Sequence, residues 1–369
     1  MTPTGRKKLV VAHSVRPEAP LHEVETNRAL ARWLAQILGF KFGGSYDAGQ
    51  HSGRELYVLP TQTLVGVAAA RQLGVKGPED LWGGYVDHDF ICTKAISHGL
   101  LGPYAQAPKG WSTLFSERVS KVVLDGFSVF SIDDAREAAE RLLENGPIRL
   151  KPIHACAGRG QELIKSPNQF GAILARPDAA QLFAEGVVLE QHLENVVTHS
   201  VGQAFIGDHV LSYCGDQYLT EDSHGEEVYG GSNLLVVRGY YEDLLELDLP
   251  DEVRLAIQQA QVFDSAADEA YPGFYASRRN YDIAQGLDSN GQQRSGVLEQ
   301  SWRMGGASSA EVAALQSFVN DPAMRAIRVS SVETYTEQAL PADAIEVYRG
   351  PAENGDFLLK YVTVKSYDG

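Results

Sequence analysis

RSGVLEQSWRMGGASSA, residues Arg294–Ala310, carries the strongest structural pattern in this chain. Glu299, Ser301 and Arg303 stand at alternate positions, and alternate side chains of a β-strand share one face. A carboxylate, a hydroxyl and a guanidinium on one face could converge on an anion and its metal ion. A half-buried strand whose polar face only meets water is the alternative. On the opposite face we expect apolar side chains that pack on a core, namely Leu298, Trp302 and Met304.

The composition indicates a globular chain with more than one packed unit. It has 369 residues, of which 44% are hydrophobic and 22% charged, and this length suggests two or three units. The net charge of -16 argues against a nucleic-acid partner, because phosphate contacts need clustered Lys and Arg. Cys92, Cys156 and Cys214 have no CxxC spacing, so neither a disulfide framework nor a zinc site is indicated.

The first residues show no pattern of a targeting segment or a membrane span. Three basic residues, Arg6 to Lys8, precede only a short apolar run, Leu9 to Ala12, which is too brief for a signal peptide or a transmembrane helix. We therefore expect a soluble, cytoplasmic protein that has no membrane partner.

Strand and helix patterns alternate in the first part of the chain. Lys8 to Ala12 is typical of a buried strand, and the apolar spacing from Leu30 to Leu38 predicts a helix that Gly39 closes. Glu55 to Leu59 predicts a second strand. This alternation indicates a small α/β unit with a largely parallel sheet.

The segment from Tyr85 to Tyr104 is harder to assign. It is rich in residues that bind metals, namely Asp87, His88, Asp89, Cys92 and His98. A metal cluster is one interpretation; core and surface positions are the more common use of His and Cys in apolar company.

A strand lysine precedes a loop of small residues. Ser131 is a predicted helix cap, and the helix that follows ends before the strand Ile148 to Ile153. Lys151 lies near the end of that strand, directly before Ala155 to Gly160. Small residues let backbone N–H groups approach phosphate oxygens, and a lysine adds a point charge. Neither GxxxxGK[ST] nor GxGxxG is present, and a plain hairpin turn is the alternative.

Two acidic residues are predicted to meet across neighbouring strands. Arg279 to Ala284 and Val297 to Ser301 are strand-like, and a polar turn around Asn290 joins them. Asp282 on the first strand would then face Glu299 on the second. Paired carboxylates on adjacent strands are costly unless a cation lies between them.

Taken together, these elements resemble the ATP-grasp superfamily of ligases. Their order is a first lysine, Lys121, then Lys151 with its glycine loop, an apolar strand that ends in a Glu-led connector, Val187 to Glu194, and an acid followed by ExNxRxGG-like residues. The resemblance covers roughly Lys121 to Ala310. It implies a mixed α/β and α+β chain, in which an ATP-grasp fold follows a small Rossmann-like α/β domain.

The resemblance also implies a division of the chain into four parts. Residues 1–114 are the expected α/β domain, residues 115–186 the ATP-grasp lid, and residues 187–326 the catalytic subdomain. Residues 327–369 follow as a β-hairpin extension, predicted from the strand-like runs Ala344 to Tyr348 and Phe357 to Val364. The hairpin is expected to extend or cap a sheet; a role in a homo-oligomer interface is left open.

The resemblance implies that ATP and Mg²⁺ bind. Lys121 and Lys151 match lysines that contact the α- and β-phosphates, and Glu194 is a substitute for the usual ribose carboxylate, because Thr198 and His199 stand at its expected place. The loop over the triphosphate is matched by Gly158, Arg159 and Gly160, and the hinge that holds adenine is matched by Glu190, Gln191 and Leu193.

The metal and phosphate ligands follow in the same way. Asp282 and Glu299 match magnesium ligands, and Ser301 stands where these enzymes usually carry an asparagine ligand, which puts a second metal in doubt. Arg303 matches the arginine that steadies the transferring phosphate. Two further arginines, Arg278 and Arg279, could grip a substrate carboxylate bidentately; surface charges at a strand entry are the alternative.

The implied reaction is the ATP-dependent joining of a small carboxylate and an amine. The carboxylate attacks the γ-phosphate and forms an acylphosphate, and the amine displaces phosphate to make a carbon–nitrogen bond. This chemistry needs no side-chain nucleophile, which agrees with the lack of a convincing catalytic triad. Two alternatives stay open: a phosphotransferase on the same scaffold, and a nucleotide-binding protein that does not catalyse.

Overall fold

The computed structural model describes residues 8–16, 18–155 and 160–367. A three-stranded parallel sheet opens the chain, as expected, in the order β2–β1–β3. Helix α1 (Leu21–Leu38) packs on it and ends at Gly39, whose φ of 66° lies in the left-handed region that glycine adopts without a steric penalty. The strands are β1 (Leu9–His13), β2 (Lys41–Ser45) and β3 (Leu56–Pro60).

Short elements connect this unit to the rest of the molecule. They are α2 (Ala48–His51), β4 (Leu64–Val65), α3 (Gly66–Leu73), η1 (Pro78–Asp80), β5 (Gly84–Val86), η2 (Asp89–Cys92) and η3 (Lys94–Ser97). Strands β4 and β5 form a small sheet with β13 (Tyr275–Ala276), which comes from far along the sequence. Helix η3 contacts β15, the edge strand of the large sheet described below.

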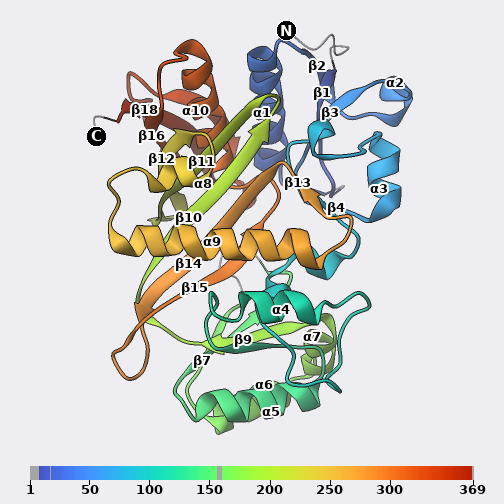
Figure 1. The fold of residues 1–369 in the computed structure, drawn as a ribbon, viewed down its shortest axis with the longest axis vertical. Helices are drawn as coiled ribbons and strands as arrows, with labels where there is room; N and C mark the ends of the chain where they lie inside the picture. Colours follow the sequence, from blue (N-terminus) through green and yellow to red (C-terminus); the bar gives the residue numbers. More distant parts are fainter. Residues whose placement is uncertain (1–7, 17, 156–159, 368–369) are drawn as a thin grey trace.

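The lower lobe in Figure 1 is a four-stranded antiparallel sheet with helices packed on it. Its elements are β6 (Gly126–Val129), α5 (Ile132–Leu143), β7 (Ile148–Pro152), β8 (Glu162–Ile164), α6 (Pro167–Leu174), α7 (Ala179–Glu185) and β9 (Val187–Gln191). Helix α4 (Thr113–Val119) precedes them and packs on α9 (Asp251–Ala270). Ser131 caps α5 by accepting a hydrogen bond from the Asp134 amide at 3.1 Å. Because β9 pairs with β6 and β7, this sheet runs past residue 186, where the sequence placed a boundary.

An eight-stranded antiparallel sheet forms the centre of the molecule, in the order β15–β14–β10–β11–β12–β16–β18–β17. Its strands are β10 (Glu194–Ile206), β11 (His209–Glu221), β12 (Glu227–Arg238), β14 (Arg278–Leu287), β15 (Gln293–Ser301), β16 (Ala326–Thr334), β17 (Ile345–Pro351) and β18 (Phe357–Ser366). The predicted C-terminal hairpin is confirmed, and it extends this sheet.

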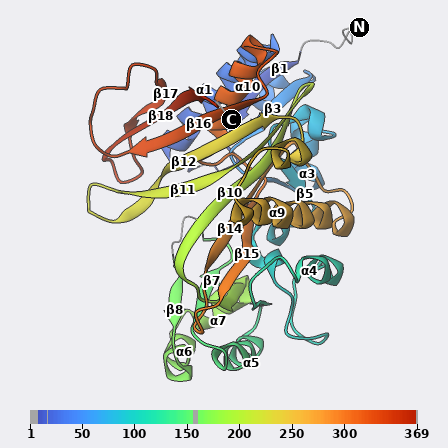
Figure 2. The ribbon, with the colours of Figure 1, turned by 60° about the vertical axis from the view of Figure 1, so that its left-hand side comes forward.

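Helices cover the two faces of the large sheet differently (Figure 2). Helices α8 (Tyr241–Leu245) and α9 (Asp251–Ala270) pack on what we call the outer face, where Tyr281 and Ile283 point. On the other face, here called the site face, α10 (Ser308–Asn320) and α1 cover one end. The opposite end of the site face meets the lower lobe. The side chains of the candidate site lie on the site face between these two ends.

Candidate active site

Asp282 and Glu299 lie directly opposite each other on β14 and β15. Side chains of directly opposed residues share a face, with Cβ atoms about 5 Å apart. A β-bulge follows, because Ile283 pairs with Val297, so Leu298 is the extra residue. The two predicted metal ligands are therefore neighbours on the site face, and the bulge brings them together, because the register on its other side would have set Asp282 against Leu298.

The structure corrects two expectations about the apolar residues of this stretch. Trp302 packs in the core under α9, on the outer face, as expected. Met304 was expected on the same face, but this is wrong: it follows the end of β15 and packs in the core under α1 and α10, which cover the site face. Leu298 was expected to pack opposite Glu299, but this is wrong. As the bulged residue, it packs instead with Leu193 and Ala284.

Hydrogen bonds fix the Asp282 carboxylate. Gln217 Nε2 donates to Asp282 Oδ1 at 2.7 Å, and Asn280 Nδ2 donates to the same oxygen at 3.1 Å. Burial raises the pKa of Asp282, and the nearby Glu299 carboxylate raises it further, to about 7. Among the described residues none donates to Oδ2, so this oxygen can serve a cation.

Lys94, which the sequence reasoning missed, forms an ion pair with Glu299. Its Nζ lies 3.1 Å from Glu299 Oε2 and donates to the Ala155 carbonyl at 2.5 Å. The Lys94 side chain is 7% exposed, which is rare for a lysine without a functional or ionic partner. The available sequence clue was a single lysine in the largely apolar run from Phe90 to Ile96.

Lys151 and Glu190 form a second buried pair on neighbouring strands of the lower lobe. Lys151 Nζ donates to Glu190 Oε1, and His98 Nε2 lies 3.1 Å from Glu190 Oε2. Burial by itself would raise the pKa of Glu190, but Lys151 and His98 outweigh it and lower the pKa to about 2. The carboxylate therefore stays ionised between a lysine and a histidine.

An apolar cluster lies beside Asp282 and Glu299, where the lower lobe meets the site face. Its members are Leu124, Leu193, Ala284 and Leu298. Ala284 and Asp282 are two residues apart on β14, so the cluster begins about 7 Å from the carboxylate. An apolar surface next to a charged one suits a ligand with an aromatic base at one end and phosphates at the other.

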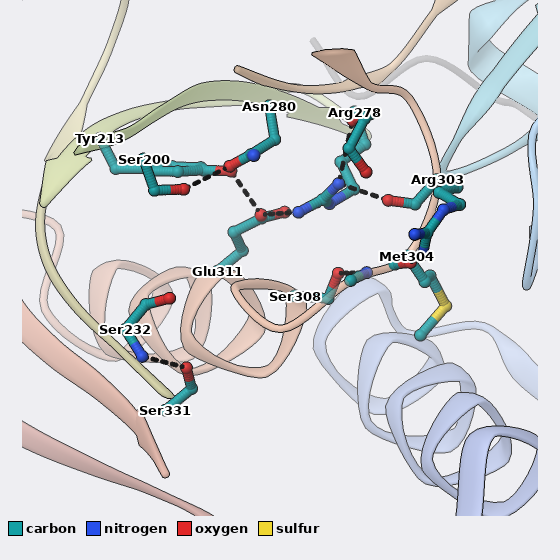
Figure 3. Close-up of polar contacts among 12 residues, drawn as sticks. Ser200, Tyr213, Ser232, Arg278, Asn280, Arg303, Met304, Ser308, Glu311 and Ser331 are labelled. Atoms are coloured by element: carbon teal, nitrogen blue, oxygen red, sulfur yellow. Dashed lines mark hydrogen bonds and ion pairs between the residues drawn. The ribbon is translucent and has the colours of Figure 1, made fainter. Parts of the chain in front are cut away.

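Ser301 and Arg303 lie on the side of the site next to Arg278. Ser301 lies directly opposite Asn280, and its carbonyl accepts from Arg278 Nη1 at 3.2 Å. Arg278 Nη1 also donates to the carbonyl of Arg303. Arg303 is partly buried, and its own Nη1 donates to the Met304 carbonyl at 2.8 Å. Figure 3 shows Arg278, Asn280, Arg303 and Met304 together with Ser308 and Glu311 of α10.

Comparison with known proteins assigns the family and the fold. The family described as "Protein of unknown function (DUF3182)" matches residues 10–362. The chain belongs to this family. No curated protein matches the DUF3182 chain.

Two solved structures share the fold across nearly the whole chain. One is phosphoribosylamine–glycine ligase from Thermotoga maritima, at 14% identity and a TM-score of 0.52, covering 97% of this chain and 93% of that one. The other is the biotin carboxylase domain of 2-oxoglutarate carboxylase from Hydrogenobacter thermophilus, in complex with MgADP, ADP and bicarbonate. It is 11% identical with a TM-score of 0.53, covering 98% of this chain and 87% of that one. The ATP-grasp resemblance and the mixed fold class are therefore confirmed.

The structure does not bring every predicted residue of the DUF3182 chain to the site. Lys121 follows α4 and is exposed, and no described residue forms a hydrogen bond or ion pair with it. Arg279 points to the outer face, where Asp264 holds it at 2.6 Å and Asp268 at 2.9 Å. The expectation that Arg279 grips a substrate therefore conflicts with the geometry, because neighbouring residues of a strand face opposite ways.

The remaining predicted positions lie at the hinge and in the glycine loop. The Gln191 amide donates to the Asp125 carbonyl at 2.8 Å, and Glu194 is exposed at the start of β10. Gly158 and Arg159 lie outside the described residues, whereas Gly160 has a φ of 67°, in the region that favours glycine.

Metal binding by the segment from Tyr85 to Tyr104 is not supported. Within the part of the chain that the structure describes, no three His, Cys, Asp or Glu side chains group as a metal site. His98 instead contacts the buried Glu190 carboxylate.

Of the described helices, none is long and apolar enough to cross a membrane.

Proposed function

We propose that this chain is an ATP-dependent ligase that activates a small carboxylate as an acylphosphate and joins it to an amine. The observation that carries the proposal is the direct opposition of Asp282 and Glu299 on the site face, beside a buried lysine and an apolar cluster. Phosphoryl transfer needs this combination, because the nucleotide brings about four negative charges that cations must offset.

Nucleotide binding is proposed for residues on both sides of the site. Lys94 and Lys151 would contact phosphate oxygens, and Lys94 takes the place proposed from the sequence for Lys121. The adenine would lie against Leu193 and Leu298. The hinge residues Glu190, Gln191 and Glu194 and the loop residues Gly158, Arg159 and Gly160 keep their proposed contacts with the nucleotide.

The donors present fit a magnesium ion that is shared with the nucleotide. Mg²⁺ prefers oxygen ligands and is commonly held by one or two carboxylates together with substrate phosphates and water, which matches Asp282 and Glu299. Bound there, it would neutralise charge on the phosphate oxygens. Ser301 is a weaker donor, and Asn280, the carboxamide opposite it, already donates to Asp282. We therefore propose one metal ion.

The chain's own residues position and neutralise the reacting groups. A carboxylate oxygen of the substrate attacks the γ-phosphorus, the bond to the β,γ-bridging oxygen breaks, and ADP leaves. The amine then attacks the acyl carbon, the bond to the phosphate oxygen breaks, and inorganic phosphate leaves. Arg303 would lie beside the transferring phosphoryl group and offset its charge. Arg278 is fully engaged within the protein, so it is proposed to hold Arg303 instead of gripping a substrate.

Product analysis with purified protein, ATP and Mg²⁺ tests this function. A panel of small acids and amines is added singly and in pairs, and ADP, phosphate and adducts are measured. A ligase consumes ATP fully only when both partners are present. A phosphorylated acceptor from one substrate alone would indicate a phosphotransferase instead. Magnesium-dependent binding of ATP with no turnover across the panel would favour a binding protein.

A further inference from the structure

One buried carboxylate on α10 lies beneath the candidate site. Glu311 is fully buried between α10 and the site face. Three neighbours on β14 share that face: Arg278, Asn280 and Asp282. Burying a charge in this way is costly unless hydrogen bonds and an opposite charge satisfy it, so the partners of Glu311 are informative.

The first partner of Glu311 is Arg278. Arg278 Nε lies 3.1 Å from Glu311 Oε2, and Nη2 lies 2.8 Å from Oε1, which is a bidentate pair. The third nitrogen, Nη1, donates to the carbonyls of Ser301 and Arg303. The guanidinium therefore connects Glu311 to the backbone that carries Arg303 (Figure 3).

The second partner is Tyr213 on β11. Its hydroxyl oxygen lies 2.8 Å from Glu311 Oε1 and 2.8 Å from Asn280 Oδ1. A phenol has one proton, so the Tyr213 hydroxyl shares it between these two acceptor oxygens and thereby links Glu311 to Asn280. Ser200 donates to Asn280 Oδ1 at 2.7 Å, and Asn280 in turn donates to Asp282.

A glycine makes this second connection sterically feasible. Gly202 on β10 lies between Asn280 and Tyr213, as it pairs with both. A Cβ atom at residue 202 would collide with the Tyr213 hydroxyl. Because Gly202 has no side chain, the tyrosine can reach across β10 to β14.

We infer that Glu311 is a positioning residue, which sets the Arg303 backbone through Arg278 and the Asp282 carboxylate through Tyr213 and Asn280. The inference rests on the proposed function of Asp282 and Arg303. One side chain remote from the reacting atoms thus fixes both the metal carboxylate and the phosphate arginine.

The outer face offers a matched control. There Asp264 on α9 is also buried, accepts a hydrogen bond from Arg279 and another from Tyr281, and lies beneath the same strand. This arrangement repeats the chemistry of Glu311, Arg278 and Tyr213, but it points away from the site. A purely structural role would make both sets respond alike.

Tyr213→Phe and Tyr281→Phe form the first test, because each variant removes one buried hydroxyl and preserves the ring. Calorimetry with a non-hydrolysable ATP analogue is run with and without Mg²⁺. We expect Tyr213→Phe to weaken magnesium-dependent binding about 10- to 100-fold, as loss of groups that orient metal ligands does, with binding in EDTA unchanged. Tyr281→Phe should bind as the unmodified protein does. Equal effects of the two variants, or none from Tyr213→Phe, would overturn the inference.

Crystal structures of the same two variants measure the positioning directly. In Tyr213→Phe the side chains of Asn280 and Asp282 should rotate, whereas in Tyr281→Phe they should stay. Unmoved side chains in Tyr213→Phe would refute the positioning role. If the unmodified protein bound no nucleotide, the proposed function would fail. The crystal structures would still decide whether Tyr213 holds the side chains of Asn280 and Asp282 in place. Glu311→Gln with Asp264→Asn extends the comparison to Arg303, where only Glu311→Gln should shift the carbonyl of that residue.

Discussion

Arg278 and Arg279 are consecutive residues of β14, yet they bind buried carboxylates on opposite faces of the sheet. Arg278 pairs with Glu311 of α10 at 2.8 Å, and Arg279 pairs with Asp264 of α9 at 2.6 Å. Strand alternation alone separates them. One guanidinium therefore contacts the residues of the candidate site, and the other joins a helix to the back of the same sheet.

Arg279→Met should lower stability without affecting the site. Removing one partner of a buried ion pair leaves a charge uncompensated and typically costs about 3–5 kcal/mol; here Asp264 would keep its hydrogen bond from Tyr281. Denaturant unfolding measures the loss, and calorimetry with Mg²⁺ and the ATP analogue should give unchanged affinity. If Arg279→Met were as stable as the unmodified protein but bound the nucleotide less tightly, Arg279 would have a role in the site.

Lys94→Met should weaken binding of the magnesium-bound analogue, whereas Lys121→Met should not. A hydrogen bond to a charged group contributes about 1.5–3 kcal/mol, which corresponds to about 10- to 100-fold in affinity. Lys121 is an exposed lysine on the same chain and serves as the control. If Lys121→Met weakened binding and Lys94→Met did not, Lys121 would again be assigned to the phosphates, as the sequence predicted.

Leu298→Ala should reduce nucleotide affinity about tenfold, because the apolar contact with adenine would lose three carbon atoms. Leu298 is only partly buried, so the fold should tolerate the change. Leu163→Ala, at an exposed leucine of β8, is the control. Measurements use the same calorimetry, and unchanged affinity in Leu298→Ala would remove adenine from this cluster.

The Glu190 carboxylate should make the free energy of unfolding depend on pH in the acidic range. The pKa of Glu190 is lowered from 4.5 to about 2, since Lys151 and His98 outweigh the effect of burial. A lowered pKa in the folded state means that the carboxylate stabilises the fold above pH 4.5, and that this stabilisation is lost as the pH falls towards 2. Unfolding free energies measured between pH 6 and about 3 should fall more steeply for the unmodified protein than for Glu190→Gln. Parallel curves would contradict the pairing.

Local pattern was sufficient for many elements. The helix that ends at Gly39, the helix capped by Ser131 and the C-terminal hairpin all follow from spacing and turn residues, whose effects act within a few positions. That Asp282 and Glu299 lie on two strands of one hairpin was also predictable, because a short polar turn joins these strands.

Other features depend on contacts between distant segments, and local pattern carries no record of these. Lys94 reaches Glu299 only because η3 packs along β15, about two hundred residues later in the chain. Leu298 turns to the site face because of a bulge, which simple alternation does not foresee.

By itself, the sequence determined the alternating strands, the hairpin that carries the two acids and the order of elements that resembles ATP-grasp ligases, since each depends on near neighbours in the chain. Only the tertiary structure decided which lysine meets Glu299 and which arginine faces the site. It also decided that Glu311 lies beneath both Asp282 and Arg303. The physical reason is that burying a charge requires a specific partner, and for these residues folding supplies that partner from a distant segment.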